Sequence, residues 1–165
     1  MPKSTLLSAE LIADQIALAK KDPRLRTNFN LHSDYKDPVQ RFLNVLTDQS
    51  YVQPHSHSQE DCWEGFIILA GELCVLQFNE LGAVTDRNIL SSQGPLYGIE
   101  LDSSQAHSIV SLSKQSVLFE YKQGPYDPSD DKIFPDWSID PEHQLSMTYL
   151  NWLKSAQPGE TCQLS

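Results

Sequence analysis

The sequence predicts a mainly β fold, a closed barrel or jelly roll with one helix near each end of the chain. Three observations carry this prediction. From residue 51 to residue 122 the chain contains about six to eight short β-rich segments that are separated by polar turns. Before and after these segments, apolar residues recur at helical spacing instead. The length of 165 residues suits a single domain with its own core, and no internal repeat is visible.

The predicted helices lie in the N-terminal and C-terminal segments. Ser8 can cap a first helix that ends before Pro23. Its apolar stripe consists of Leu11, Ile12, Ile16 and Ala19. We expect this helix to pack on the outside of the barrel or on a partner subunit. Near the other end, Asp140, Pro141 and Glu142 are typical of a helix start. The apolar face that follows consists of Leu145, Tyr149, Trp152 and Leu153.

Between these helices lies the predicted barrel, and we expect one domain over residues 1–165. Residues 1–23 form the first helix, residues 24–126 the barrel with its entry segment, and residues 127–165 a C-terminal arm and helix. The predicted strands are residues 51–57, 63–69, 72–78, 83–90, 97–101, 107–112 and 115–122. A tight corner is expected at Ala70 and Gly71. Proline and aspartate are frequent from residue 126 to residue 137, which suits a surface arm.

Charge and hydropathy exclude several classes of partner. The formal net charge is −10, from 22 acidic and 12 basic side chains. Such a chain repels the phosphates of nucleic acids and anionic membrane surfaces. No apolar run is long enough to span a bilayer. We therefore expect a small-molecule ligand, and neither a nucleic acid nor a membrane.

The N-terminus and the cysteines predict a cytoplasmic location. Glu10 and Asp14 interrupt the N-terminal segment before the apolar region of a signal peptide could form. The three cysteines, Cys62, Cys74 and Cys162, are widely spaced and include no CxxC pair. A disulfide framework is not expected from this pattern, which indicates a reducing compartment.

The stretch from Pro54 to Gly71 contains the strongest chemical signal. His55 and His57 are two residues apart, so in a strand both imidazoles project to the same side. His107 opens a later strand and is the expected further ligand. Neutral imidazoles with a carboxylate suit a divalent metal ion such as zinc, iron, manganese or nickel. The alternative is a histidine pair on a solvated edge strand.

Three acids in this stretch, Glu60, Asp61 and Glu64, are candidates for the carboxylate ligand. Glu64 shares the parity of Phe66 in a strand that is largely apolar on both faces. Burying a carboxylate there is costly unless it is paired or coordinates a cation, which favours Glu64. Three imidazoles and one carboxylate leave one or two positions open on a six-coordinate metal, as catalysis or ligand capture requires.

The arrangement of His55, His57, Glu64, Gly71 and the distant His107 resembles the metal-binding signature of the cupin superfamily. A longer set of motifs is similar to the WbuC-type cupin-fold metalloproteins, which occur with bacterial O-antigen and surface-polysaccharide genes. These motifs are Asn28-Phe-Asn30-Leu-His32, Pro38-Val-Gln40-Arg41, Ser50-Tyr51-Val52, Pro54-His55-Ser-His57, Trp63-Glu64, Leu69-Ala-Gly71, Ala106-His107-Ser108 and the run from Glu120 to Tyr126. One departure is the longer interval between His57 and Glu64, six residues where the general cupin pattern has fewer.

The resemblance implies a cupin-type double-stranded β-helix, that is, a jelly-roll barrel with flanking N- and C-terminal helices. It implies one divalent metal ion per chain. The metal ligands that it implies are His55, His57, Glu64 and His107. His32, Arg41 and Tyr126 become candidates for substrate binding. Because cupins commonly pair through sheet edges and terminal arms, we also expect a homodimer.

Glu120 and Lys122 are the candidate catalytic residues. They share the parity of Leu118, so both face the same side of their strand. Close to a metal they could act as general acid and base, and the alternative is an ordinary cross-strand ion pair. Arg41 could bind a phosphate or carboxylate, or only pair with an acid. A structural hydrogen bond is the corresponding alternative for His32.

Two classes of function follow. One is a metal-dependent enzyme on a sugar or sugar nucleotide, linked to surface-polysaccharide (O-antigen) biosynthesis, with isomerase or epimerase chemistry, or with oxygen chemistry if the metal is iron. The other is a module that binds a metal and a small ligand without turnover. A purely structural metal with a closed coordination shell is a third possibility. The fold supports all of them.

Overall fold

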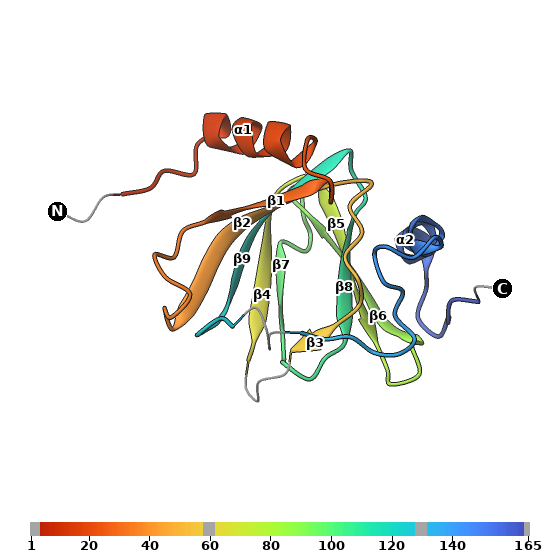
Figure 1. The fold of residues 1–165 in the computed structure, drawn as a ribbon. Coiled ribbons are helices and arrows are strands. Elements are labelled where there is room, and N and C mark those ends of the chain that lie inside the picture. The colour runs from red at the N-terminus through yellow and green to blue at the C-terminus, as the bar shows by residue number, and fades with distance from the viewer. Residues whose placement is uncertain (1–3, 58–61, 128–131, 164–165) are drawn as a thin grey trace.

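Two antiparallel β-sheets face each other, with one helix against the outer side of each (Figure 1). The computed structural model describes residues 4–57, 62–127 and 132–163. Within these residues the larger sheet has the order β1 (Arg26–Asn30), β2 (Val39–Thr47), β9 (Gln115–Gln123), β4 (Glu64–Ala70) and β7 (Gly98–Leu101). The smaller sheet has the order β6 (Val84–Ser91), β5 (Glu72–Phe78) and β8 (His107–Ser111). A third ladder pairs β3 (Ser56–His57) with β10 (Lys132–Ile133).

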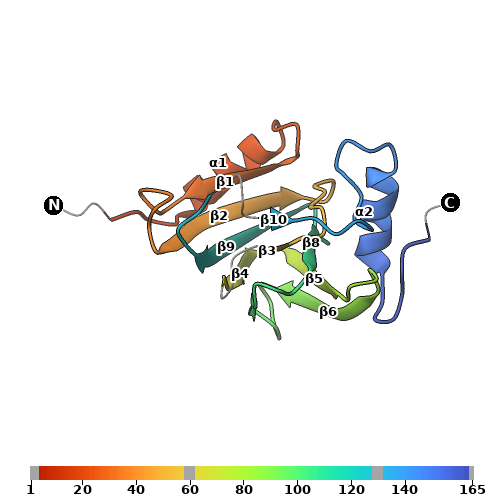
Figure 2. The ribbon, with the colours of Figure 1, turned by 60° about the horizontal axis from the view of Figure 1, so that its bottom comes forward.

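The sheet order gives the chain its jelly-roll character. Strands distant in sequence lie side by side, because β9 pairs with both β2 and β4, and β8 pairs with β5. The ladder of β3 and β10 lies between the two sheets at one end of the barrel (Figure 2). The chain is therefore a mainly β jelly roll with a helix on either side, as its sequence predicts.

The main core fills the space between the sheets. Its buried members include Leu46, Phe66, Ile68, Leu73, Val75, Leu90, Ile109 and Leu118. In β4 the residues alternate, since Glu64, Phe66 and Ile68 are buried while Ile67 and Leu69 are exposed on the outer face. The predicted corner after this strand is present: Gly71 has a φ of +79°, and an added Cβ would lie 2.5 Å from the carbonyl oxygen of Gln115.

The first helix, α1 (Ala9–Ala19), covers the outer face of the larger sheet (Figure 1). The Ser8 side chain accepts a hydrogen bond from the backbone N–H of Leu11, which confirms the predicted cap. Ile12, Ile16 and Ala19 pack against Val45, Val117 and Ala70 of the sheet. The predicted apolar stripe thus holds the helix on its own barrel.

The second helix, α2 (Ser146–Ser155), begins later than the sequence predicts. Asp140 does not start a helix, because its carboxylate accepts a hydrogen bond from Glu142 N–H and His143 N–H bonds to its carbonyl, which makes a turn. The helix itself buries the predicted apolar side. Tyr149, Leu150 and Leu153 pack against the outer face of the smaller sheet.

The entry segment contains two strands that the sequence did not separate from a loop. In β2 every residue from Phe42 to Thr47 is buried, because the core covers its inner face and α1 lies over part of its outer face. Alternation of polar and apolar residues is therefore absent. In contrast, the strand expected over residues 51–57 is short, since Pro54 has no N–H to donate to a ladder.

Candidate metal centre

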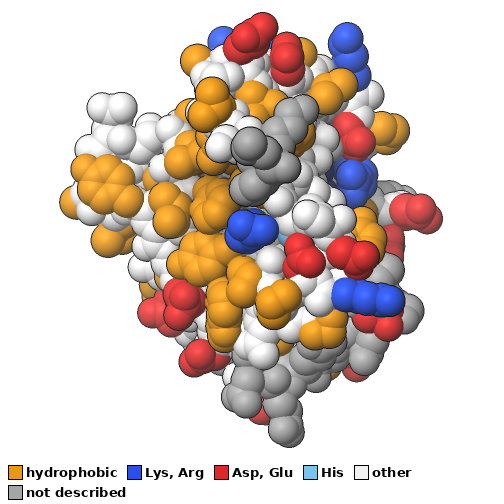
Figure 3. All heavy atoms as spheres, turned by 90° about the vertical axis from the view of Figure 1, so that its left-hand side faces the viewer, with side chains coloured by type: hydrophobic (Ala, Val, Ile, Leu, Met, Phe, Trp, Pro, Cys, Tyr) orange, Lys and Arg blue, Asp and Glu red, His pale blue; other side chains and the backbone are white. Residues whose placement is uncertain are grey.

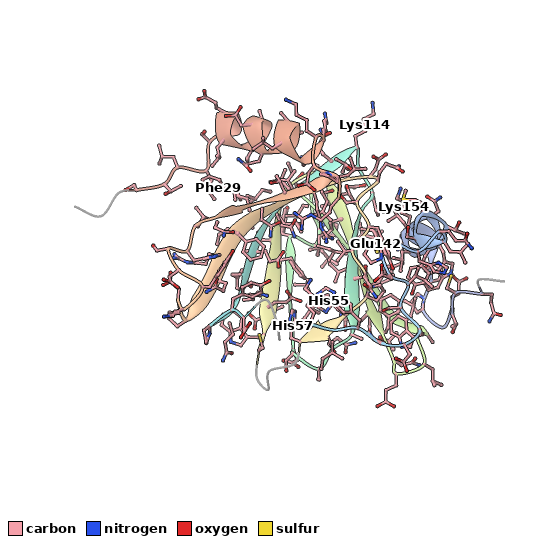
Figure 4. The ribbon with its side chains drawn as sticks, in the orientation of Figure 1. Phe29, His55, His57, Lys114, Glu142 and Lys154 are labelled. Carbon is pink, nitrogen blue, oxygen red and sulfur yellow. The ribbon has the colours of Figure 1, made fainter. Side chains whose placement is uncertain are left out.

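Four buried side chains meet inside the open end of the barrel. They are His55, His57, Glu64 and His107, and one ligand atom from each lies within 4.8 Å of the others. In Figure 4, His55 and His57 point into the space between the two sheets, near β3. The structure thus brings together the four predicted ligands. The other candidate acids, Glu60 and Asp61, lie outside the described residues, as do residues 58–61 of the predicted loop.

Backbone hydrogen bonds hold these residues in place. His55 and His107 form an isolated antiparallel bridge, in which each N–H donates to the other's carbonyl, at 3.0 Å and 2.8 Å. The N–H of His57 donates to Ser103 O at 2.9 Å. Glu64 opens β4 between Lys122 of β9 and Leu101 of β7. Each ligand is therefore fixed by a different part of the barrel.

The imidazoles of His55 and His107 have a defined tautomer. Their Nδ1 atoms lie 2.8 Å from Gln53 O and 2.9 Å from Gln105 O. A carbonyl oxygen can only accept a hydrogen bond, so both Nδ1 atoms carry the proton. In the neutral rings each Nε2 then presents a lone pair to the cluster. Backbone partners of this kind orient histidine ligands in metal sites.

The contacts of Glu64 show that the cluster fits a cation. Its Oε1 lies 2.9 Å from His57 Nε2 and 2.5 Å from His107 Nε2. With the proton of His107 on Nδ1, two hydrogen-bond acceptors face each other there. Such a pair is stable only with a proton or a metal ion between them. Three imidazole nitrogens and one carboxylate suit zinc, iron, manganese or nickel.

The electrostatics agree with a neutral imidazole at His55 and an ionised carboxylate at Glu64. Burial lowers the pKa of His55 well below its usual value, and Lys132 lowers it further. Burial alone would raise the pKa of Glu64, but contacts with His107 and His57 outweigh it and hold that pKa well below the usual range. These are the protonation states in which the residues can bind a metal.

The cluster opens into a polar cavity of about 230 Å³. Asn28, Asn30 and His32 line it together, as their alternation predicts. Glu120, Lys122 and Tyr126 line it as well. A small molecule in this cavity would therefore contact the metal ligands and both candidate catalytic residues at once.

Glu120 and Lys122 share the cavity side of β9, as predicted. The Nδ2 group of Asn44 donates a hydrogen bond of 2.8 Å to Glu120 Oε2. Burial and, next, the charge of Glu64 raise the pKa of Glu120 to about 7. The ammonium of Lys122 lies 4.4 Å from the centre of the Tyr126 ring. Glu120 therefore titrates near neutral pH beside the metal ligands.

His32 and Arg41 occupy different places. The Nδ1 of His32 lies 3.1 Å from the backbone N of Arg41 and 3.0 Å from the carbonyl oxygen of the same residue, so Arg41 holds this side of the ring. The Nε2 of His32 is buried and has no hydrogen-bond partner among the described residues. His32 thus has backbone contacts on one nitrogen and an unpartnered nitrogen at the cavity wall on the other. The side chain of Arg41 is exposed and does not line the cavity.

Four cavity residues were missed by sequence reasoning: Arg24, Arg26, Asn44 and Lys132. Arg26 has the strand parity of Asn28 and Asn30, and this signal was available in the sequence. Asn44 lies opposite Asn28 in the ladder of β1 and β2. Lys132 comes from the C-terminal arm and pairs with His57, a contact that no local pattern indicates.

Comparison with known proteins supports the fold. The family model described as "Domain of unknown function (DUF6016)" matches residues 7–90. CapF of Staphylococcus aureus, a capsular polysaccharide assembling protein, is 18% identical with a TM-score of 0.54, over 66% of this chain and 29% of its own. A structure of CapF with the inhibitor 3-isopropenyl-tropolone gives 19% identity and a TM-score of 0.52, over 66% of this chain and 31% of that one. This chain thus spans under a third of CapF.

A cupin superfamily protein of Desulfitobacterium hafniense is also similar, at 15% identity with a TM-score of 0.46, over 59% of this chain and 76% of its own. No curated protein sequence matches this chain. The sheet topology, with the similarity in fold to CapF, confirms the predicted mainly β jelly roll with flanking helices. The resemblance to WbuC-type proteins in particular stays a prediction. No helix in the described part of the chain is long and apolar enough to cross a membrane.

Proposed function

This chain belongs to the family described as "Domain of unknown function (DUF6016)", and we propose that it is a metal-dependent enzyme of the WbuC type. Its substrate would be a small polar molecule, a sugar or sugar nucleotide, in surface-polysaccharide (O-antigen) synthesis. One observation carries the proposal: a buried cluster of three histidines and Glu64 shares a polar cavity with Glu120, whose pKa is near neutral. A purely structural metal would not need such a cavity.

The proposed metal ligands are His55, His57, Glu64 and His107, with one divalent ion per chain. Once bound, the ion supplies Lewis-acid stabilisation of negative charge on a substrate oxygen. Four protein ligands leave room for such an oxygen in a five- or six-coordinate shell. The barrel excludes bulk water from the site, because all four side chains are buried.

Glu120 is the proposed general acid or base. A carboxyl group with a pKa of about 7 can both take and return a proton at neutral pH. Asn44 fixes one of its oxygens by a hydrogen bond, which leaves the other to face the substrate. Lys122 shares the cavity face of the same strand and would hold negative charge that develops on the substrate. Proton movement next to a carbonyl is the step of an isomerase or epimerase that these groups support.

The proposed ligand class has two kinds of support. The cavity wall carries amides and His32, which suit the hydroxyl groups of a sugar. His32, through its Nε2, and Tyr126 are the proposed substrate-binding residues. The similarity in fold to CapF, a capsular polysaccharide assembling protein, agrees with the polysaccharide context. This second support is an analogy between folds.

We also propose a cytoplasmic homodimer without nucleic-acid or membrane partners. The outer face of β4 exposes Ile67 and Leu69, by 41% and 37%, and Leu96 and Tyr97 nearby are exposed too. Figure 3 shows hydrophobic side chains gathered over one face of the molecule. A second copy would cover such a face. Among the described residues none of the three cysteines forms a disulfide, which agrees with a reducing compartment.

Proton NMR in heavy water tests the enzyme. Metal-loaded protein is incubated with a panel of nucleotide sugars that carry a keto group, and we expect deuterium to enter at the carbon next to the carbonyl of one of them. Glu120→Gln should abolish the exchange while the metal stays bound. Exchange that is unchanged in Glu120→Gln would remove Glu120 from the mechanism. If no sugar nucleotide turns over or exchanges, the chain is a binding module instead.

A further inference from the structure

The charge inside the cavity is opposite to that of the whole chain. Among the described residues that line it, the basic ones are Arg24, Arg26, Lys122 and Lys132, and the acidic ones are Glu64 and Glu120. The chain as a whole has a formal net charge of −10. A polar cavity that collects cations on an acidic protein attracts anions and raises their local concentration.

The fold brings these cations together from separate strands. Arg26 lies on β1, Lys122 on β9, and Lys132 on β10, where it is paired with His57. Lys132 is exposed, while Lys122 is buried beside Glu64 in the ladder of β4 and β9. The cations therefore extend from the metal ligands to the surface.

Two of these cations, Arg26 and Lys132, have pKa values below the ordinary ones. Burial lowers the pKa of Arg26, and the charge of Arg24 lowers it further. Desolvation of the Lys132 ammonium at the cavity wall lowers the pKa of Lys132; Glu64 and Glu120 oppose this, whereas Arg26 and Lys122 add to it. Placing like charges together in a partly desolvated cavity is costly. An anion among them would remove this cost.

The two acids in the cavity have other roles. Glu64 contacts His57 and His107, and Glu120 accepts a hydrogen bond from Asn44. Arg24 is exposed and contacts Asp22 at 3.3 Å, so we base the proposed anion site on Arg26, Lys122 and Lys132. A bound divalent metal would make the cavity more positive still.

We propose that the cavity recognises an anionic ligand, a small polar molecule whose carboxylate or phosphate group is bound by Arg26, Lys122 and Lys132. The sugar-like remainder of the ligand rests on the proposed function. That remainder faces His32 Nε2 and Asn44 Oδ1, two buried polar atoms that have no partner among the described residues. The inference thus narrows the substrate class from polar molecules to sugar acids and sugar phosphates.

Isothermal titration calorimetry on metal-free protein tests this inference without relying on the metal. The probes are glucuronate, glucose 6-phosphate and neutral glucose, at low ionic strength. We expect at least one of the two anions to bind about tenfold or more tightly than glucose, since charge-assisted hydrogen bonds are the stronger kind. Added salt should weaken the binding of the two anions and leave the binding of glucose unchanged. The anion that binds more tightly identifies the group that the cavity recognises, a carboxylate or a phosphate.

Matched variants locate the anion. Lys132→Gln should weaken anion binding about tenfold, and Lys132→Arg should restore most of it. Lys132 is exposed, so neither change is expected to disturb the fold, which circular dichroism checks. Lys114→Gln removes the same charge at the opposite end of the barrel (Figure 4) and should leave binding unchanged.

Two results would overturn the inference: no anion binds better than glucose, or Lys132→Gln and Lys114→Gln have equal effects. Because the titration uses metal-free protein, its failure is separate from a failure of the proposed enzyme. Anion binding by a protein that never takes up a metal would sustain the inference and reject the proposed function.

Discussion

The interior of the barrel has two halves, built by the same strands but with opposite character. Towards α1, the inward side chains are apolar, with Leu46 on β2 and Leu118 on β9. Two residues away on the same face of each strand, towards the open end of the barrel, lie Asn44 on β2 and Glu120 on β9. Both residues line the cavity. β8 changes in the same way, from Ile109 to His107. The closed half is a packed core and the open half is a site.

Stability and chemistry depend on different halves of the barrel. The closed half buries apolar surface and supplies much of the folding free energy. The open half buries two carboxyl groups, a lysine and four histidines, whose desolvation opposes folding unless a ligand is bound. Substitutions in the closed half should therefore act mainly on stability, and those in the open half also on the pH dependence of stability.

The largest expected effect is in the closed half. Leu118→Ala removes a fully buried side chain from the core and should lower the free energy of unfolding by about 2–5 kcal/mol. Urea denaturation followed by circular dichroism measures it. The same change should leave the metal stoichiometry of the folded fraction intact. A loss below about 1 kcal/mol would mean that this half is not the stabilising core.

The next effect is a pH dependence in the open half. Below pH 4.5, the ordinary pKa of a glutamate, Glu120 is protonated in both the folded and the unfolded chain. Between there and its folded pKa of about 7, only the folded state keeps the proton, so stability falls as pH rises. Over this pH range the free energy of unfolding of the metal-free protein should fall by about 3 kcal/mol.

Glu120→Gln should abolish the part of the pH dependence of stability that comes from Glu120. Urea denaturation at a series of pH values between 4.5 and 7 measures the difference from the parent protein. Glu142→Gln is the matched control, because Glu142 is exposed and does not line the cavity. Equal slopes in the parent and Glu120→Gln would show that Glu120 keeps an ordinary pKa.

A smaller effect is expected from Asn44→Ala. The change removes the hydrogen bond to Glu120 and should destabilise the protein by about 1–3 kcal/mol at neutral pH. Since this bond lowers the pKa of Glu120, its loss should move the pH midpoint assigned to Glu120 upwards. Comparison of the two pH profiles measures the shift. A midpoint that moves down or stays fixed would contradict the assignment.

The smallest effect on the fold is expected outside the barrel, on the proposed dimer face. Ile67→Ser should change the stability of the monomer by only about 0.5 kcal/mol, because the side chain is already exposed. Light scattering should nevertheless show a shift from dimer to monomer. A monomeric parent protein would reject the homodimer, and an unaffected dimer would place the interface elsewhere.

Much of the open half was predictable because its signals are local. The alternation of His55 and His57, the parity of Glu64 with Phe66, and the shared parity of Glu120 and Lys122 each follow from strand geometry. Burial cost then selected Glu64 as a ligand. These inferences needed no knowledge of which strands are neighbours.

The rest depends on long-range contacts. β2 is buried on both faces, so it lacks the alternation that marks a strand. Lys132 reaches the site only through the pairing of β10 with β3, and the start of α2 was set by turn bonds around Asp140. Arg41 was predicted as a substrate-binding residue and does not line the cavity, whereas Arg26, which shares the strand parity of Asn28, does.

The metal content of the purified protein is the most direct test of the proposed metal centre. Protein purified without a metal-affinity column is analysed by inductively coupled plasma mass spectrometry, beside His55→Ala/Glu64→Ala and the control Glu142→Gln. We expect about one divalent transition-metal ion per chain in the parent and the control. The double variant should lose nearly all of this metal. An equal metal content in all three proteins, or none in the parent after incubation with zinc, iron, manganese and nickel, would contradict the proposed metal centre.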